Sequence, residues 1–546
     1  MILSDLMKSA GMTGHALEKD PDITSIHYRS QDVSPGGLFV AIPGFLADGH
    51  DYIEDAARRG ASVVVVQKSV LAQKKMVRPE SALFIETDDS RKSLAWLAAA
   101  FYGHPSKKLT VIGITGTNGK TTTSFIMESI FQEAGGNVGV MGTINSRYMG
   151  RILESETTTP ESADLQRVMA DMVHAGVTHL ILEVSSHSID LQRIAGCHFD
   201  VGLFTNLTQD HLDYHKTMDH YRAVKKRFFT GFMEQSEKKR PVAVINRERL
   251  VGQEFFDELT QSKNSKLRCL SVGFADENMI RPTGFQIDPR GVSGRIEVLD
   301  DCFSGEGPCR SGAQREGLPG KGFDLKSKLP GRHNLENILC AAGAGVALGL
   351  SVKTIQKGIE KCESAPGRLE PVENRRGLFI YVDYAHTPDA LENVLRALKQ
   401  LGKGRLICLF GCGGDRDAKK RPMMGRIAGE WSELAIITSD NPRSEDPDQI
   451  IKEILEGVKE SCPHHYSQAP GRDDFLEKGH VAEPDRETAI RLAIMAAAPG
   501  DQILIAGKGH ETYQLIGGKK NPFDDRLKVL EALGEADIDD FLQNHA

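Results

Sequence analysis

One segment constrains the fold of this chain more than any other. An apolar run, Val111–Ile114, leads into a glycine-rich turn that ends in Lys120 and Thr121, and a helical pattern follows from about Thr122 to Phe131. Glycine has no side chain, so backbone N–H groups in such a turn can approach phosphate oxygens, and the helix N-terminus adds its dipole. The order of strand, glycine turn and helix therefore predicts a phosphate-binding loop.

The residue types in this loop predict ATP and magnesium. Lys120 can reach the terminal phosphates, and the Thr121 hydroxyl can ligate magnesium. The spacing is a shorter variant of the strict pattern, because Ile114 stands where a further glycine is usual. A plain glycine turn between a strand and a helix is the alternative. The residues expected to bind ATP here are Gly116, Thr117, Asn118, Gly119, Lys120, Thr121 and Thr122.

Composition narrows the class of protein. A chain of 546 residues is long enough for about three or four domains. The net charge of −8 gives no reason to expect nucleic acid or an anionic membrane as a partner, and no apolar run is long enough to span a bilayer. The nine cysteines are scattered without a C-x-x-C pair, which indicates reduced thiols. We expect a cytoplasmic protein.

Short apolar runs alternate with helical stretches along the whole chain, which predicts an α/β fold with largely parallel sheets. Breaks near 103–108 and 363–367 divide the chain into predicted domains 1–106, 107–364 and 365–546. A polar, glycine-rich stretch at 300–323 is expected to be an insertion loop. The expected strands are 63–66, 83–85, 111–114, 180–184, 201–204, 242–245, 378–382, 406–410, 434–437 and 503–506.

Polar motifs follow several strands of the central part. Glu183 stands at a strand end, where a carboxylate can hold magnesium, although such a residue is also a common helix cap. The segment Asn206–His215 contains Asp210 and His211, which can form a second cation site or a capped helix start. The charge run at 225–227 would ordinarily be a solvated helix face.

The last third carries four strand-end loops with polar residues, which begin at positions 383, 411, 439 and 507. Arg416 can clamp a carboxylate or a phosphate. Pro442 stiffens a turn that displays Asp440 and Arg443, and this opposite-charge pair suits a zwitterionic ligand. Earlier in the chain, Asn334 and its neighbours can either recognise an adenine edge or cap a helix.

Together these motifs resemble the Mur ligase family, which joins amino acids to a nucleotide-linked cell-wall precursor. The resemblance covers nearly the whole chain. It is closest to the members that add meso-diaminopimelate, because Arg443 gives the second carboxylate of this amino acid a partner that lysine would not need. The motifs are Gly116–Thr121, Glu183–His187, Asn206–His215, His333–Asn334, Gly367–Glu370, Asp383–His386 and Asp440–Arg443.

The resemblance implies a three-domain α/β fold with a smaller N-terminal α/β domain, a central P-loop-type mononucleotide-binding parallel sheet and a Rossmann-like C-terminal domain. It implies an ATP-dependent amide ligase that acts through an acyl phosphate in peptidoglycan precursor synthesis and releases ADP and phosphate. The implied substrates are UDP-N-acetylmuramoyl-L-alanyl-D-glutamate and meso-diaminopimelate. A monomer is expected.

The resemblance also implies residue roles. Lys225 matches a family lysine that is carbamylated by carbon dioxide and then ligates magnesium. Two Mg²⁺ sites are implied, one near Thr121 and Glu183 and one near Lys225 and His211, with Lys120, Lys225 and His211 as catalytic residues. Nucleotide contacts fall on Asn334 and Asp383; precursor contacts fall on Ser30, Thr158, Thr159, Ser185 and Arg193; diaminopimelate contacts fall on Arg416, Asp440, Asn441, Pro442, Arg443, Gly507 and Glu511.

Two other functions compete with this interpretation. A folylpolyglutamate synthase has a similar phosphate loop, but the N-terminal domain with Asp48–His50 and the turn at 440–443 argue against it. A nucleotide-gated binding protein would hydrolyse ATP without ligation, and the amino-acid complementarity of the C-terminal loops disfavours it. Phosphate release that needs both a UDP-muramoyl-dipeptide and an amino acid distinguishes the three.

Overall fold

The computed structural model describes residues 1–12, 19–44, 47–73, 78–155, 157–262, 265–299, 321–466 and 477–534. Most of the predicted insertion loop at 300–323 lies outside the described residues. No helix within the described ranges is long and apolar enough to cross a membrane. The chain forms two compact units: the first comprises Met1–Pro282, Ile296–Phe323 and Glu336–Ile359, and the second comprises Thr283–Arg295, Asp324–Leu335 and Glu360–Ala546.

The N-terminal part of the first unit is built on a parallel sheet with the strand order β1-β2-β3-β4. Successive side chains of a strand point to opposite faces, so Val63 and Val65 pack with α1 and α4, whereas Val64 and Val66 pack with α2. The elements are α1 (Leu3–Ser9), β1 (Ser25–His27), η1 (Ser30–Asp32), β2 (Gly37–Val40), η2 (Gly49–Tyr52), α2 (Ile53–Arg58), β3 (Ala61–Gln67), α3 (Lys68–Gln73), β4 (Leu83–Thr87) and α4 (Ser90–Phe101).

The central sheet has the order β15-β14-β13-β12-β11-β10-β5-β9-β6-β7-β8. Its core from β12 to β6 is parallel, and one face packs on α7, α10 and α11. The elements are α5 (Pro105–Lys108), β5 (Thr110–Thr115), α6 (Lys120–Glu133), β6 (Val138–Met141), β7 (Asn145–Tyr148), β8 (Arg151–Glu154), α7 (Ser162–His174), β9 (His179–Glu183), α8 (Ser186–Asp190), β10 (Val201–Phe204), α9 (Leu212–His215), α10 (Met218–Arg227), the π-helix η3 (Phe228–Met233), β11 (Val242–Asn246), α11 (Leu250–Gln261), β12 (Arg268–Val272), β13 (Ile280–Asp288), β14 (Gly291–Val298), β15 (Lys321–Ser327), α12 (Arg332–Ala347) and α13 (Val352–Lys361).

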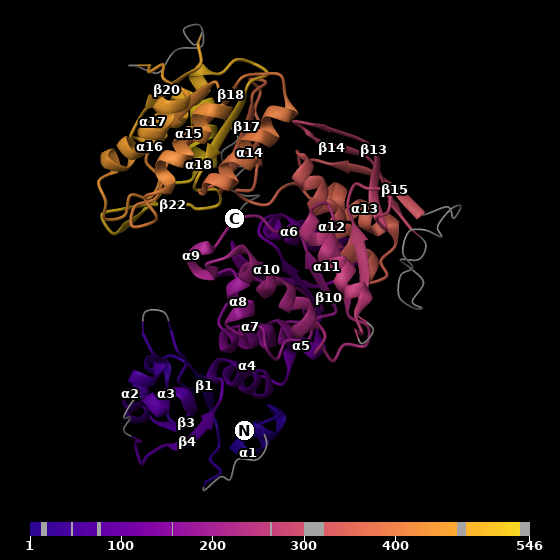
Figure 1. Cartoon of the computed structure of the whole chain (residues 1–546), viewed down its shortest axis with the longest axis vertical. Coiled ribbons are helices and arrows are strands. Elements are labelled where there is room, and N and C mark those ends of the chain that lie inside the picture. The colour runs from indigo at the N-terminus through magenta and orange to yellow at the C-terminus, as the bar shows by residue number, and fades with distance from the viewer. Residues whose placement is uncertain are drawn as a thin grey trace. The chain divides into compact units, whose positions relative to one another are not determined.

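The second unit contains a six-stranded sheet of order β16-β17-β21-β18-β19-β20, in which only the pair β16–β17 is antiparallel. Figure 1 shows β17, β18 and β20 of this sheet among the helices α14 to α18. Cys408 faces a core shared with α14, α15 and α16, while its neighbour Leu409 faces α17 and α18. The elements are β16 (Glu370–Val372), β17 (Phe379–Asp383), α14 (Pro388–Leu401), β18 (Leu406–Phe410), α15 (Lys420–Trp431), β19 (Leu434–Ile437), α16 (Pro447–Ser461), β20 (Gly479–Ala482), α17 (Arg486–Ala496), β21 (Gln502–Ala506), β22 (Tyr513–Ile516), β23 (Lys519–Pro522) and α18 (Asp525–Leu533).

The predicted α/β class with largely parallel sheets is confirmed, and every apolar run expected to form a strand does so. The structure also contains strands that the sequence did not predict. Among them are the buried parallel strands β2, β6 and β12 and several antiparallel strands. β7 and β8 extend the central sheet beyond β6, and β22 and β23 form a separate hairpin. These strands lack continuous apolar runs, since β8 and β23 are exposed along their whole length.

Candidate active site

The turn after β5 has the geometry of a phosphate-binding loop. Gly116 and Gly119 have φ angles of 148° and 86°, a region that favours glycine. A Cβ atom on Gly116 would lie 1.9 Å from Thr205 Oγ1, and one on Gly119 would lie 2.2 Å from Asn337 Oδ1. α6 begins at Lys120 without a side-chain cap hydrogen bond, and the N-terminus of a helix attracts an anion.

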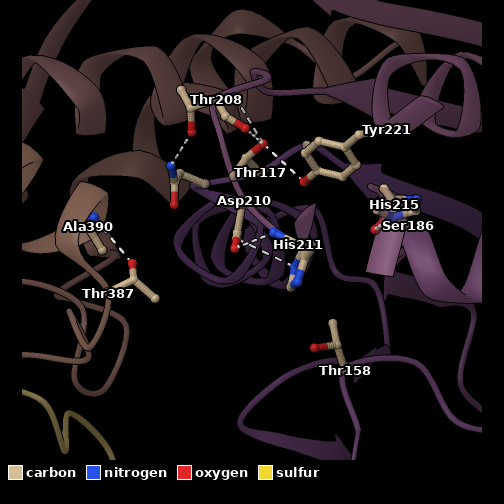
Figure 2. Close-up of polar contacts among 12 residues, drawn as sticks. Thr117, Thr158, Ser186, Thr208, Asp210, His211, His215, Tyr221, Thr387 and Ala390 are labelled. Carbon is tan, nitrogen blue, oxygen red and sulfur yellow. Dashed lines mark hydrogen bonds and ion pairs between the residues drawn. The ribbon is translucent and has the colours of Figure 1, made fainter. Parts of the chain in front are cut away.

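Hydrogen bonds shape the outer side of this loop. The Thr117 hydroxyl lies 3.1 Å from the Tyr221 hydroxyl and accepts a hydrogen bond of 3.0 Å from the Thr208 backbone N–H. Figure 2 shows these three residues together. The Asn118 backbone N–H donates to Asn206 Oδ1 at 2.9 Å. These contacts use Thr117 and Asn118 to fix the loop against the segment that follows β10.

Two lysine side chains converge on one carbonyl oxygen of the loop. Lys120 Nζ donates to Gly116 O at 3.0 Å and to Thr117 O at 2.8 Å. Lys225 Nζ, on α10, donates to Gly116 O at 2.9 Å and is almost fully buried. Burial holds the pKa of Lys225 well below its ordinary value, and the charge of Lys120 lowers it further against an opposing effect of Asp210. Both effects shift the protonation equilibrium of Lys225 toward the uncharged amine.

Glu183 ends β9 beside the phosphate loop and is 1% exposed. Its Oε2 accepts hydrogen bonds from Thr121 Oγ1 at 3.1 Å and from Thr143 Oγ1 at 2.9 Å. Thr143 Oγ1 also lies 3.1 Å from Thr158 Oγ1. A carboxylate and hydroxyl oxygens next to a phosphate loop are the donors that magnesium prefers, so these residues fit the predicted first cation site.

The second predicted cation site is less complete. His211 adopts a left-handed backbone with φ of 52°, and Asp210 accepts its backbone N–H at 2.8 Å (Figure 2). Desolvation lowers the pKa of His211; Asp210 opposes this shift, and the charges of Lys120 and Lys225 add to it. Among the described residues, no group of three or more His, Cys, Asp or Glu side chains can hold a metal ion. His211 and Lys225 thus share an environment that lacks a full ligand set of unmodified side chains.

Four of the predicted precursor-binding residues lie close to Glu183. Thr158 reaches it through Thr143, and Thr159 Oγ1 donates to Glu183 O at 2.7 Å. The Ser185 backbone N–H donates to Thr159 Oγ1 at 3.1 Å, and Arg193 Nη1 donates to Thr159 O at 3.1 Å.

The fifth predicted precursor contact, Ser30, lies outside this cluster, in η1. There it hydrogen-bonds Asp55, and this bond is the largest cause of the lowered pKa of that carboxyl group.

In the second unit, the two predicted nucleotide contacts are engaged locally. Asp383 accepts the backbone N–H groups of Leu369 at 2.6 Å and Ala385 at 2.7 Å, and burial raises its pKa. Asn334 Nδ2 donates to Pro330 O at 2.8 Å. Both side chains therefore shape their own loops.

The predicted zwitterion turn is held rigidly. Arg443 has φ of 54°, its backbone N–H donates to Leu515 O at 2.9 Å, and its Nη1 donates to Gly414 O at 2.7 Å. Asp440 is 6% exposed, and its Oδ1 has no hydrogen-bond partner among the described residues. A Cβ atom on Gly507 would lie 3.6 Å from Asp440 Oδ2. This places Gly507 beside the Asp440 carboxylate.

The remaining predicted residues of this site differ in exposure. Arg416 is exposed and its Nη1 lies 3.4 Å from Asp415 O. Pro442 is buried in the turn. Asn441 Nδ2 donates to Glu511 Oε2 at 2.8 Å, so these two predicted contacts are joined directly.

The sequence interpretation missed Lys508, which is fully buried between these residues. Its Nζ lies 3.2 Å from Asn441 Oδ1, 3.3 Å from Glu511 Oε2 and 3.7 Å from Asp440 Oδ1. The one available signal was its position between two glycines in a strand-end loop, Gly507–Glu511.

Comparison with known proteins identifies the family of this chain. Models of the Mur ligase family match three segments: the family catalytic domain at residues 22–102, the middle domain at 114–345 and the glutamate ligase domain at 367–509. A UDP-N-acetylmuramoyl-L-alanyl-D-glutamate--2,6-diaminopimelate ligase of Geobacter metallireducens is 43% identical over 515 residues, which cover 94% of each chain. The chain belongs to the Mur ligase family. The predicted class, an ATP-dependent ligase, is confirmed with it.

Further Mur ligases support the same assignment. A protein of the same name from Geobacillus kaustophilus is 40% identical over 94% of this chain and 96% of its own length. A solved structure of a ligase with that name aligns over 100% of both chains, with a TM-score of 0.66 and 27% identity. The predicted arrangement of N-terminal, central nucleotide-binding and C-terminal domains is thereby confirmed.

A folylpolyglutamate synthase of Mycobacterium tuberculosis solved with ADP has a TM-score of 0.55 at 17% identity, over 77% of this chain and 91% of its own length. This similarity shows a common fold and nothing more.

Proposed function

We propose that this Mur ligase uses ATP to join meso-diaminopimelate to UDP-N-acetylmuramoyl-L-alanyl-D-glutamate in peptidoglycan precursor synthesis. The observation that carries the proposal is the rigid turn that presents Asp440 and Arg443. Asp440 Oδ1 accepts no hydrogen bond among the described residues and has only the 3.7 Å ion pair with Lys508, so it can accept a hydrogen bond from an ammonium group, and the anchored Arg443 guanidinium suits a carboxylate. The printed names of relatives that are 40% and 43% identical support the same substrates.

The chemistry is amide formation in two displacements. An oxygen of the D-glutamyl γ-carboxylate attacks the γ-phosphorus of ATP, and ADP leaves. The diaminopimelate amine, having lost its proton, then attacks the acyl carbon, and phosphate leaves with that carboxylate oxygen. Lys120 and the loop N–H groups stabilise the negative charge of the transferring phosphoryl group. Asn334 and Asp383 are assigned to the nucleotide.

Thr121 and Glu183 would hold one Mg²⁺ ion, which would supply charge neutralisation at the phosphates. A second ion would be held near His211 by a carbamate on Lys225. The structure supports this modification in one respect: burial shifts Lys225 toward the uncharged amine, which is the form that can add carbon dioxide. The carbamate would supply the anionic ligand that the unmodified side chains of the region lack.

The carbamate is tested by removing its amine. Lys225→Ala should be inactive and should regain part of its activity with added formate or acetate, because a small carboxylate can occupy the place of the carbamate. Lys226→Ala is the matched control, since Lys226 is a partly exposed neighbour paired with Glu258. Full activity of Lys225→Ala without added carboxylate would exclude the carbamate.

The remaining roles belong to the same proposal. Thr158, Thr159, Ser185 and Arg193 would hold the muramoyl-dipeptide, and Ser30 would hold the uridine end. Domain boundaries at 106/107 and 364/365, a monomeric state and a place in the cytoplasm stay predictions, as do roles in cell shape and cell division.

The test of the whole proposal is phosphate release with each substrate omitted in turn. The rate should depend on both the UDP-muramoyl-dipeptide and meso-diaminopimelate, and lysine should replace diaminopimelate poorly. Phosphate release without either substrate would instead indicate a nucleotide-gated hydrolase. Release that needs a folate and glutamate would indicate a folylpolyglutamate synthase.

A further inference from the structure

Lys508 is a buried cation in the middle of the proposed amino-acid site. Its side chain is fully buried, and lysine is almost never fully buried unless it is paired. The flanking glycines have positive φ angles of 112° and 53°. A Cβ atom on Gly509 would lie 2.7 Å from Tyr384 Cβ, so the chain passes close to its neighbours where Lys508 turns inward.

The ammonium group of Lys508 is shared among side chains of the site rather than committed to one structural partner. It lies within 3.7 Å of Asp440 Oδ1, Asn441 Oδ1 and Glu511 Oε2. By contrast, the neighbouring buried cation Arg486 makes two hydrogen bonds of 2.7 Å to Asp525. The positive charge of Lys508 therefore balances the carboxylates of Asp440 and Glu511.

The same contacts fix the geometry of the site. Asn441 Oδ1 accepts from Lys508 and from the Leu515 backbone N–H at 2.9 Å, while its Nδ2 donates to Glu511. The Asn441 amide is thus oriented by three partners, and Glu511 is held from two sides. An oriented Glu511 and a charge-balanced Asp440 are what an ammonium group of the substrate would meet.

We propose that Lys508 is a positioning residue for the amino-acid substrate, which sets the orientation of Asn441 and Glu511 and the charge balance of Asp440. The inference rests on the proposed function, because it concerns the same diaminopimelate site. Lys508 acts through these side chains, so its loss should weaken use of the amino acid without weakening use of ATP.

The experiment compares Lys508→Met with the parent enzyme. Methionine keeps a long unbranched stem and removes the charge. Hydrogen bonds to charged groups carry enough free energy that KM for diaminopimelate should rise about tenfold to a hundredfold. KM for ATP and for the UDP-muramoyl-dipeptide should stay within about twofold. Lys452→Met is the matched control, because Lys452 is exposed on α16 and its substitution should change none of the three values.

A second variant tests the charge argument. Glu511→Gln keeps the shape of the side chain and removes its charge. If Lys508 balances that charge, the double variant Lys508→Met/Glu511→Gln should lose less than the product of the two single losses, because contacting residues are energetically coupled. Lys508→Arg keeps the positive charge, so its KM for diaminopimelate should rise less than that of Lys508→Met. If Lys508→Met does not fold, the test uses Lys508→Arg instead.

The outcomes separate the inference from the function on which it rests. An unchanged KM for diaminopimelate in Lys508→Met would refute the positioning role. An equal loss for all three substrates, with a lower Tm and multiplicative losses in the double variant, would reduce Lys508 to a structural residue. If the parent enzyme itself fails to use diaminopimelate with the UDP-muramoyl-dipeptide, the proposed function fails instead.

Discussion

Arg443→Ala is expected to remove the preference for diaminopimelate over lysine. In the structure the guanidinium is anchored by one hydrogen bond, from Nη1 to Gly414 O at 2.7 Å. The backbone on either side is paired through Leu515 O and the Gly517 N–H. The turn should therefore keep its shape in the variant, while the group that meets the second carboxylate of diaminopimelate is lost.

The expected magnitude follows from the contacts. One N–H group of Arg443 is already used by Gly414, and the side chain is half-buried, so we assign one charge-assisted interaction with the substrate. Such an interaction is worth about 2 kcal/mol, which corresponds to about thirtyfold in kcat/KM. Lysine has no second carboxylate, so its kcat/KM should change by less than about twofold.

The assay is kcat/KM for both amino acids at saturating ATP and UDP-muramoyl-dipeptide. Arg491→Ala is a suitable control, because Arg491 is half-exposed on α17 and pairs only with Glu487 four residues earlier among the described ion pairs. An equal loss for both amino acids would show that Arg443 acts on the turn rather than on the second carboxylate. An unchanged ratio at full activity would place that carboxylate elsewhere.

Two further predictions concern the phosphate loop. Lys120→Met should lower kcat by at least about a hundredfold while leaving the fold intact, which circular dichroism checks; near-normal turnover would remove Lys120 from the mechanism. Lys225→Met should raise Tm in buffer free of carbon dioxide. The lowered pKa of Lys225, caused first by burial and then by Lys120, means that the unfolded chain binds a proton more tightly. Stability of the parent should therefore increase as pH rises from the lowered pKa to the ordinary lysine value. The gain in Tm from Lys225→Met should be largest near the lowered pKa and should vanish above the ordinary lysine pKa. A gain in Tm that does not change with pH would contradict this reasoning.

Apolar runs predicted many of the buried strands, although the short buried strands β2, β6 and β12 were missed. Leu406–Phe410 and Leu434–Ile437 coincide with β18 and β19, because strands buried on both faces are apolar at every position. The edge strand Arg151–Glu154 was missed, since all four residues are exposed and no apolar pattern marks them. Antiparallel additions at sheet edges are stabilised by backbone pairing, which leaves little trace in composition.

The candidate site likewise contains residues that the local sequence predicts and residues that it does not. The turn at Gly116 and Gly119 and the helix that begins at Lys120 could be predicted, because they follow from local chain order. Lys508 could not, because lysine ordinarily indicates a solvated surface, and its burial depends on Asn441, 67 residues earlier in the chain. Likewise, nothing local to α10 predicts that Lys225 reaches Gly116 O across 109 positions; only the family resemblance singled it out.

The central claim is that ATP activates the D-glutamyl carboxylate before the amine attacks. The most direct measurement uses UDP-muramoyl-dipeptide labelled with ¹⁸O in both oxygens of the γ-carboxylate, followed by mass spectrometry of the products. One labelled oxygen should appear in the released phosphate and one should stay in the new amide carbonyl. Unlabelled phosphate formed together with the tripeptide product would contradict an acyl phosphate.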